Sequence, residues 1–218
     1  MIIDPYAWRE YTITEIELVA EDTVAIRFIR PQGYVFQAGQ YAVVRVNTGG
    51  HQLIRQYSFA SSPKSDTLEI LVQKEPGGEV SNWFCETAKV GDTVELSQPF
   101  GNFTIELGRR PLLLIAGRVG IAPFMSISRE RRRKLHVIYS VRSRHQVCYA
   151  EELYAVGATI ISTDHSPRIS QEMLMPFLTD KPLIYVCGSK QFVDAIMSLL
   201  NKSGVAPEDV RRELFTLQ

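Results

Sequence analysis

Alternating apolar and polar residues mark the first half of the 218-residue chain. Short alternating runs that are rich in β-branched and aromatic residues are typical of half-buried strands. Turns containing glycine, proline or asparagine separate these runs, and several short strands at such spacing predict a small antiparallel β-barrel. A helical segment is expected at residues 81–88, with Ser81 as its N-cap. The predicted strands are residues 23–28, 40–46, 53–59 and 67–73.

Strand and helix patterns alternate in the second half of the chain. Residues 112–116 form a continuous apolar run, as expected of a parallel strand that is covered on both faces. A repeating strand–helix order predicts a parallel sheet with helices on its faces. The other predicted strands are residues 135–140, 158–163 and 183–187. The predicted helices are residues 122–131, 150–155, 171–178 and 191–201.

These two textures predict a β plus α/β chain. We expect an antiparallel β-barrel domain in residues 1–108, followed by a parallel-sheet α/β domain in residues 109–218.

Composition narrows the class of protein. Hydrophobic residues make up 45% and charged residues 22% of the chain, which is ordinary for a globular protein. No apolar run approaches the ~18 residues of a membrane helix, and the first residues do not resemble a signal peptide. Cys85, Cys148 and Cys187 have neither disulfide nor metal-site spacing. We therefore expect a reduced, cytoplasmic protein without a metal site, membrane insertion or a nucleic-acid partner.

Charge is divided unevenly along a chain whose net charge is zero. Residues 1–108 hold eight basic and fourteen acidic side chains, and residues 109–218 hold sixteen basic and ten acidic ones. A basic half in a neutral chain indicates anion binding, although chance drift between two solvated surfaces gives the same numbers.

The first segment with candidate chemistry is Arg55-Gln56-Tyr57-Ser58. On a strand, Arg55 and Tyr57 project to one face and Ser58 to the other. Periodicity alone favours an ordinary barrel strand with a surface arginine and a half-buried tyrosine.

Two glycine-containing segments could bind an anion. Residues 76–81, with Gly77, Gly78 and Ser81, lead into the predicted helix, where backbone N–H groups and the helix dipole favour a phosphate. Residues 116–123 follow a buried strand and open a helix, which is the setting of a dinucleotide loop. The spacing is not that of the Rossmann fingerprint, and ordinary turns remain alternatives for both segments.

Taken together, these segments resemble the ferredoxin–NADP reductase superfamily of flavin-dependent pyridine-nucleotide reductases. The superfamily's flavin signature Arg-x-Tyr-Ser/Thr is matched by Arg55, Tyr57 and Ser58. Its Gly-x-x-Ser/Thr pyrophosphate element is matched by Gly78 and Ser81. The resemblance covers nearly the whole chain, and its motifs occur in the family's order.

The nicotinamide loop of this superfamily usually reads Gly-Gly-Thr-Gly-Ile-Ala-Pro. Arg118 replaces a usual glycine, and Val119 replaces a usual threonine, which removes a hydroxyl donor. Arg118 would either add charge at the pyrophosphate or obstruct it. The matching residues are Gly117, Gly120, Ile121, Ala122 and Pro123.

Two later segments extend the resemblance. Tyr185-Val186-Cys187-Gly188 is similar to the strand that carries a Cys-Gly pair beside the nicotinamide. Residues 213–215, with Glu213 and Phe215, are similar to the terminal Glu-x-aromatic element.

The resemblance implies an FAD-binding barrel and an NAD(P)-binding α/β domain. Arg55 would bind the flavin pyrophosphate, Tyr57 would pack on the isoalloxazine ring, and Ser58 would hydrogen-bond flavin N5. Cys187 and Glu213 would act with Ser58 as the catalytic residues, since hydride transfer depends on positioning. The implied cofactor-binding residues are Arg55, Gln56, Tyr57, Ser58, Gly77, Gly78, Val80, Ser81, Gly117, Arg118, Val119, Gly120, Pro123, Arg142, Arg144, Arg168, Cys187, Gly188 and Phe215.

The nucleotide is expected to be NADPH, with NADH as the alternative. An acidic residue at the end of the second strand reads the ribose hydroxyls of NADH, whereas arginine accommodates the 2′-phosphate of NADPH. Here that strand ends with Arg142 and Arg144 and without an acid, and Arg168 could converge on the same place.

Basic residues cluster at 129–134, at the end of a predicted helix. Stabilisation of the helix C-terminus explains them, and the alternative is a docking patch for an acidic carrier such as ferredoxin or flavodoxin.

Three functional hypotheses follow. The first is a reductase that moves hydride from NADPH to FAD N5 and then single electrons to a carrier. The second is the electron-transfer subunit of a multi-component oxygenase or reductase, whose iron–sulfur centre would lie on another polypeptide. The third is a flavin-binding module that no longer uses nicotinamide, which Arg118 and Val119 motivate.

Overall fold

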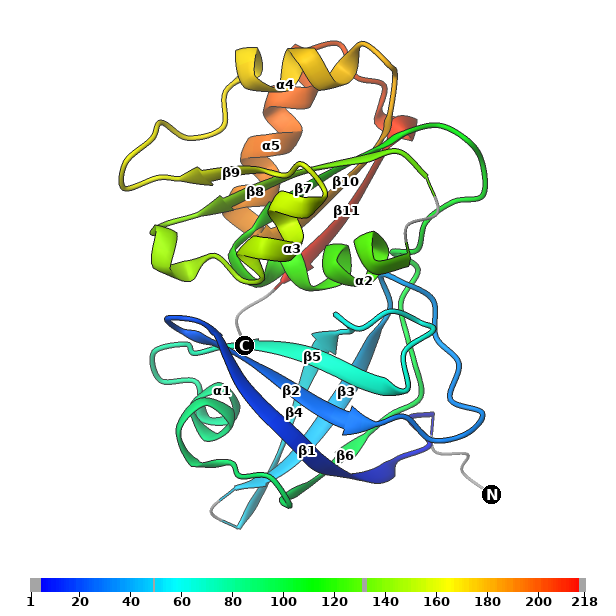
Figure 1. Cartoon of the computed structure of the whole chain (residues 1–218), viewed down its shortest axis with the longest axis vertical. Coiled ribbons are helices and arrows are strands. Elements are labelled where there is room, and N and C mark those ends of the chain that lie inside the picture. The colour runs from blue at the N-terminus through cyan, green and yellow to red at the C-terminus, as the bar shows by residue number, and fades with distance from the viewer. Residues whose placement is uncertain (1–4, 49, 131–132, 216–218) are drawn as a thin grey trace. The chain divides into compact units, whose positions relative to one another are not determined.

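The computed structural model describes residues 5–48, 50–130 and 133–215, which form two compact units (Figure 1). The first unit comprises Met1–Ile105 and Met125–Glu130, and the second comprises Glu106–Phe124 and Arg131–Gln218. The expected domain boundary after residue 108 stays a prediction.

The first unit is built on a six-stranded antiparallel sheet in the order β4-β3-β6-β1-β2-β5. A bridge between Phe59 and Ile70 brings the chain after β4 beside β5, so the two ends of this order meet in a barrel. The expected barrel is thereby confirmed. The strands are β1 (Arg9–Ala20), β2 (Thr23–Ile29), β3 (Tyr41–Thr48), β4 (His51–Ser58), β5 (Thr67–Gln73) and β6 (Thr93–Leu96).

Two of these strands, β1 and β6, were not predicted from the sequence pattern. In β1 the register shifts between Ile13 and Glu15, as at a β-bulge, so its apolar residues do not keep a period of two. β6 has only four residues, too few for an alternation to be detected.

The barrel encloses an apolar core to which every strand contributes, and this burial is the main favourable term in its folding. Tyr34 within this core donates a hydrogen bond from its hydroxyl to the carbonyl oxygen of Ser97, 2.9 Å away. Fully buried members of the core include Ile13, Ile26, Phe28, Val44, Phe59, Ile70 and Leu96.

The helical segment of the barrel begins earlier than predicted. Helix α1 (Glu79–Asn82) continues into a π-helical turn, Trp83–Thr87. Gly78 is the N-cap, so the assignment of Ser81 to that position is wrong. The Ser81 Oγ accepts a hydrogen bond from the Glu75 N–H and donates one to the Gly78 carbonyl, so it fastens the preceding turn from inside the helix.

The second unit is built on a five-stranded parallel sheet in the order β11-β10-β7-β8-β9. The parallel sheet predicted from the sequence is confirmed. Its fifth strand, β11, was not predicted as a strand because it is a half-buried edge strand with charged residues among its apolar ones. The strands are β7 (Leu112–Gly117), β8 (Leu135–Val141), β9 (Thr159–Ser162), β10 (Leu183–Ser189) and β11 (Val210–Phe215).

Helices follow the strands as the βαβ pattern predicts. Residue 131, at the end of the expected helix 122–131, lies outside the described residues. Short 3₁₀ turns occur at Arg118–Ile121, Arg144–Gln146 and Pro207–Asp209. The helices are α2 (Ala122–Glu130), α3 (Ala150–Ala155), α4 (Gln171–Leu178) and α5 (Lys190–Lys202).

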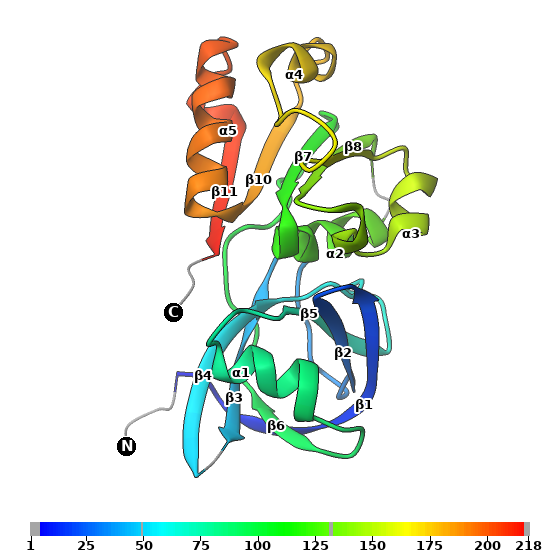
Figure 2. The ribbon, with the colours of Figure 1, turned by 90° about the vertical axis from the view of Figure 1, so that its left-hand side faces the viewer.

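Helices α4 and α5 cover one face of the parallel sheet (Figure 2). Ile115 and Val186 point to that face and pack with Leu174 and Ile196 of the two helices. Because side chains alternate along a strand, Cys187 projects to the opposite face. Among the described helices, none is long and apolar enough to cross a membrane.

Gly39 allows a close backbone approach in the barrel. It has a φ of +98° and lies in a turn closed by a 3.0 Å hydrogen bond from the Gln40 N–H to the Gln37 carbonyl. A Cβ added at Gly39 would lie 2.0 Å from the carbonyl oxygen of Phe103. Gly33 also has a positive φ, +81°, but a Cβ there would meet nothing within 4 Å.

We predict that Gly39→Ala lowers the free energy of unfolding by about 3 kcal/mol, because strain and a clash with rigid backbone combine. Gly33→Ala is the matched control and should cost only about 1 kcal/mol, since it adds strain alone. Denaturant unfolding followed by circular dichroism measures both. Equal losses in the two variants would contradict the prediction.

Candidate functional site

Strand β4 carries the predicted flavin signature and stands at one end of the barrel's strand order. Its exposure alternates, with Arg55 and Tyr57 half-buried and Gln56 exposed. Ser58 ends the strand, is buried and lies opposite Tyr41 of β3. The expectation that Arg55 and Tyr57 share one face therefore agrees with the burial pattern.

Arg55 and Tyr57 differ in how they are held. The Tyr57 ring packs edge-on against Phe84, with 6.0 Å between ring centroids, and burial raises the pKa of Tyr57. The Arg55 guanidinium donates a 2.8 Å hydrogen bond to the carbonyl of the adjacent Ile54. Within the described ranges, Arg55 forms no ion pair, which leaves its planar fork available to an anion.

The predicted pyrophosphate element is a tight turn that leads into α1. Gly77 has a φ of +76°, and a Cβ added at Gly78 would lie 2.5 Å from the Ser81 Oγ. No side chain caps the start of α1, so its first N–H groups remain available. The Val80 side chain lies in the barrel core, so this residue can offer a ligand only its backbone.

These features fit a group with a phosphate and a flat ring. An arginine without a carboxylate partner, a glycine turn and an uncapped helix start are suited to the phosphate. The half-buried Tyr57 offers an apolar face to a ring. Ser81 is an exception, because its hydroxyl proton is directed at the Gly78 carbonyl rather than at a ligand.

In the second unit, a glycine lets the loop after β7 pack closely against the end of β10. A Cβ on Gly120 would lie 2.5 Å from the carbonyl oxygen of Cys187, at the end of β10. A Cβ on Gly117 or Gly188 would lie within 2.8 Å of the Phe192 ring. The carboxyl ends of β7 and β10 thus meet through bare backbone, at the edge where open α/β sheets bind ligands.

Arg118 occupies this loop with a φ of +51°, in the left-handed region that favours glycine. Its side chain is exposed, whereas Val119 is half-buried. Pro123 is the second residue of α2, where its missing N–H costs no helical hydrogen bond. Glycine is usual at this position in the family because the backbone is left-handed here. Arginine adopts the same conformation at a cost in strain.

Cys187 and Glu213 lie side by side on neighbouring parallel strands. They are register partners of β10 and β11, and the Cys187 Sγ is 4.0 Å from a carboxylate oxygen of Glu213. Burial, and secondarily Glu213, raise the pKa of the Cys187 thiol well above its usual value, so the thiol is neutral. Phe215 is half-buried and pairs with Ser189 two positions further on.

The three predicted 2′-phosphate arginines are exposed beyond the carboxyl ends of β8 and β9. Arg142 follows β8, and Arg144 lies in a 3₁₀ turn that Ser143 caps by accepting a hydrogen bond from the His145 N–H. Arg168 lies in the segment between β9 and α4.

Asp164 is an acidic residue at this edge that sequence reasoning missed. Its N–H donates a 3.0 Å hydrogen bond to the carbonyl of Arg142, and its carboxylate accepts a hydrogen bond from Ser162. Asp164 follows β9, whereas Arg142 follows β8. The two residues meet only because β8 and β9 pair in the sheet. Phe192 was also missed, because no sequence pattern links it to Gly117 and Gly188.

The basic cluster at 129–134 is engaged within the chain wherever it is described. Arg129 pairs with Glu69, Arg133 donates to the carbonyl groups of Glu106 and Arg110, and Lys134 pairs with Asp180. Residues 131 and 132 lie outside the described residues. These contacts favour a structural role for the cluster over a docking patch.

Comparisons with known proteins agree with this geometry. Residues 10–105 match the family model described as an oxidoreductase FAD-binding domain. The toluate 1,2-dioxygenase electron transfer component of Pseudomonas putida is 31% identical over 224 residues, which cover 93% of this chain and 66% of that protein. The reductase component of propane 2-monooxygenase from Rhodococcus jostii is 28% identical, over 94% of this chain and 62% of that protein.

A solved structure shows the same fold. The ferredoxin NADP+ reductase of Neisseria gonorrhoeae, with bound FAD and NADP, superposes with a TM-score of 0.81 and 21% identity, covering 95% of this chain and 98% of that one. Residues 10–105 thus form an oxidoreductase FAD-binding domain. Over nearly its whole length the chain is similar to reductase components of oxygenase systems and has the fold of a ferredoxin NADP+ reductase, which supports the predicted family and its FAD and NAD(P) cofactors. It spans about two thirds or less of the length of the two curated relatives named above.

We predict that Arg118→Gly raises the free energy of unfolding by about 0.5 kcal/mol. Relief of the left-handed conformation, about 1–2 kcal/mol, exceeds the extra chain entropy of glycine, about 0.5–1 kcal/mol. Arg144→Gly, at an exposed position with negative φ, is the control and should lose about 0.5 kcal/mol. Denaturant titration measures both, and a loss in the two variants alike would count against strain at Arg118.

Proposed function

We propose that the chain is a flavin-dependent oxidoreductase that takes hydride from NADPH and passes single electrons to a carrier protein. FAD, when bound, accepts the hydride at N5 and releases its electrons one at a time. The observation that carries the proposal is that one chain holds both halves of the chemistry. The barrel has an arginine strand and a glycine turn, and the parallel sheet has glycine loops at its carboxyl edge.

On the flavin side, each residue has a role that its surroundings support. The Arg55 fork binds the pyrophosphate, together with the first N–H groups of α1, because the Gly78 N–H is already donated to the Glu75 carbonyl. Tyr57 packs on the flavin ring and excludes water from it. The Ser58 hydroxyl hydrogen-bonds N5, where hydride arrives, so it orients the acceptor atom.

On the nucleotide side, Gly117, Gly120 and Gly188 let the loop after β7, the end of β10 and the Phe192 ring pack closely. The dinucleotide would bind along this carboxyl edge of the sheet. The neutral Cys187 thiol and the Glu213 carboxylate lie together at this edge and steady the nicotinamide. Both side chains come from neighbouring paired strands, and such rigid elements position reacting groups better than loops do.

The acceptor is proposed to be a ferredoxin, a flavodoxin or the iron–sulfur subunit of an oxygenase. The relatives named as electron-transfer and reductase components of a dioxygenase and a monooxygenase support the last of these. A carrier of that kind takes one electron at a time, which matches the proposed chemistry.

Purified protein should bind FAD and turn yellow, and NADPH added without oxygen should bleach the flavin within seconds. Stopped-flow absorbance near the flavin band measures the rate. Arg55→Ala should weaken FAD binding by about tenfold or more, because it removes charge-assisted hydrogen bonds worth about 1.5–3 kcal/mol. Protein that takes up no FAD would overturn the proposal, and bound FAD that NADPH never bleaches would favour the non-catalytic flavin module.

The proposed preference for NADPH rests on Arg142, Arg144 and Arg168. We predict that Arg142→Ala raises the KM for NADPH about tenfold and changes the KM for NADH less than twofold, since only NADPH carries the 2′-phosphate. Steady-state kinetics with both nucleotides test this. Lys202→Ala, which removes an exposed cation at the end of α5, is the matched control.

Asp164 is the specific observation that favours the NADH alternative, because the hydrogen bond from its N–H to the Arg142 carbonyl brings an acidic residue to the end of β8. If NADH is the substrate, Asp164→Asn raises the KM for NADH and Arg142→Ala affects both nucleotides alike. That pair of results would overturn the preference for NADPH.

A further inference from the structure

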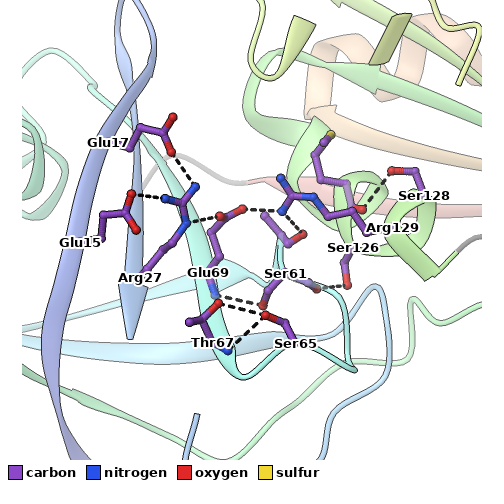
Figure 3. A network of polar contacts seen from close by, with 12 residues as sticks. Glu15, Glu17, Arg27, Ser61, Ser65, Thr67, Glu69, Ser126, Ser128 and Arg129 are labelled. Atoms are coloured by element: carbon purple, nitrogen blue, oxygen red, sulfur yellow. Dashed lines mark hydrogen bonds and ion pairs between the residues drawn. The ribbon is translucent and has the colours of Figure 1, made fainter. Parts of the chain in front are cut away.

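Glu69 of β5 is a buried carboxylate held between two arginines (Figure 3). One carboxylate oxygen lies 2.6 Å from the Arg27 Nε, and the other lies 2.6 Å from the Arg129 Nη1. Only 5% of the Glu69 side chain is exposed, so its charge depends on these partners. Burial would raise the pKa of Glu69, but the arginines outweigh it and hold this pKa below its usual value.

Arg27 is balanced from its other side. It also pairs with Glu15 and Glu17 of β1, each at 2.6 Å. Arg27 thus retains carboxylate partners whatever happens at Glu69, and Glu69 retains Arg27 if Arg129 is removed. Arg27 nevertheless shares one positive charge among three carboxylates, so Arg129 contributes most to keeping the buried Glu69 carboxylate ionised.

Beyond its charge, Arg129 adds contacts to the chain just after β4, the strand of the proposed flavin site. Its Nη1 also donates a 2.9 Å hydrogen bond to the Ala60 carbonyl. Ser126, one turn earlier on α2, donates a 2.7 Å hydrogen bond from its hydroxyl to the Ser61 carbonyl (Figure 3). The Glu69 N–H donates to the Ser61 Oγ at 3.0 Å, and the Ala60 N–H donates to the Glu69 carbonyl at 2.8 Å.

These contacts secure the main chain two and three residues beyond Ser58. On its other side, Ser58 is held by the β3–β4 ladder, opposite Tyr41. Buried ion pairs contribute little net stability, because desolvation offsets their attraction, whereas they do impose one geometry. The buried Glu69 carboxylate is therefore better explained by the position it gives to the chain after β4 than by a gain in stability.

We propose that Glu69 and Arg129 are positioning residues for flavin reduction, which fix Ala60 and Ser61 and through them the place of Ser58. The inference rests on the proposed function, in which Ser58 hydrogen-bonds flavin N5. A displacement of about 1 Å at a reacting centre can lower a rate by about 100-fold, so a modest shift of this segment is measurable.

The test compares Arg129→Met and Glu69→Gln with a matched control, Arg45→Met. Arg45 also forms a cross-strand ion pair in the barrel, with Glu95, and its side chain is 22% exposed against 20% for Arg129. In stopped-flow reduction at saturating NADPH, both network variants should be slowed about tenfold, with the KM for NADPH within twofold of wild type. Their flavin midpoint potential or absorption band should shift, and the control should match wild type in every measurement.

Wild-type rates and an unshifted flavin in both network variants would overturn the proposal, and so would a change confined to the KM for NADPH. Arg129→Lys keeps the charge but loses the planar fork, and it should fall between wild type and Arg129→Met. If Arg129→Met does not fold, the lysine variant decides the question by the same criteria.

Hydrogen exchange separates failure of this inference from failure of the proposed function. Peptides that cover residues 58–66 should exchange faster in Arg129→Met than in Arg45→Met, with or without FAD. If wild-type protein takes up no FAD, the proposed function fails, whereas unchanged exchange in Arg129→Met overturns the positioning role by itself.

Discussion

Close packing that only glycine permits is the constraint on which both candidate sites depend. At Gly120 a side chain would collide with the carbonyl group of Cys187, and at Gly78 it would collide with the hydroxyl of Ser81. These positions lie where helices begin, and the first N–H groups of a helix have no partner within it. Close approach and unused donors together make a surface that a phosphate or a dinucleotide can contact directly.

Arg118 shows how this constraint is relaxed at one position. The loop after β7 keeps the left-handed backbone that the usual family glycine would adopt, although an arginine now occupies it. The loop shape is therefore set by its neighbours, Gly117 and Gly120, and by the packing of Phe192 against the former. A charged side chain is thereby presented at the loop after β7 without a change of fold.

A buried ionisable side chain is charged in the first unit and neutral in the second. In the first unit, Glu69 is ionised between arginines and ties β5, β2 and α2 to the chain after β4. In the second unit, the Cys187 thiol is kept neutral by its apolar surroundings and by the adjacent Glu213. The first arrangement links segments through charged hydrogen bonds, and the second places a polarizable group without charge at the carboxyl edge of the parallel sheet.

The sequence by itself determined the classes of both units and most of their elements. Strand alternation and the βαβ order depend on local burial patterns, so residues 67–73, 150–155 and 171–178 were predicted with the bounds that the structure has. Resemblance to a known superfamily supplied the candidate roles of Arg55, Ser58 and Cys187, which periodicity alone would have left as ordinary strand residues.

Only the tertiary structure decided which distant residues meet. Strand register puts Cys187 beside Glu213 and Asp164 beside Arg142, although 26 residues separate the first pair. The bulge in β1 and the pairing of Glu69 with Arg129 were hidden for the same reason. Each depends on hydrogen bonds or charges between segments far apart in the chain, and a local pattern carries no information about such partners.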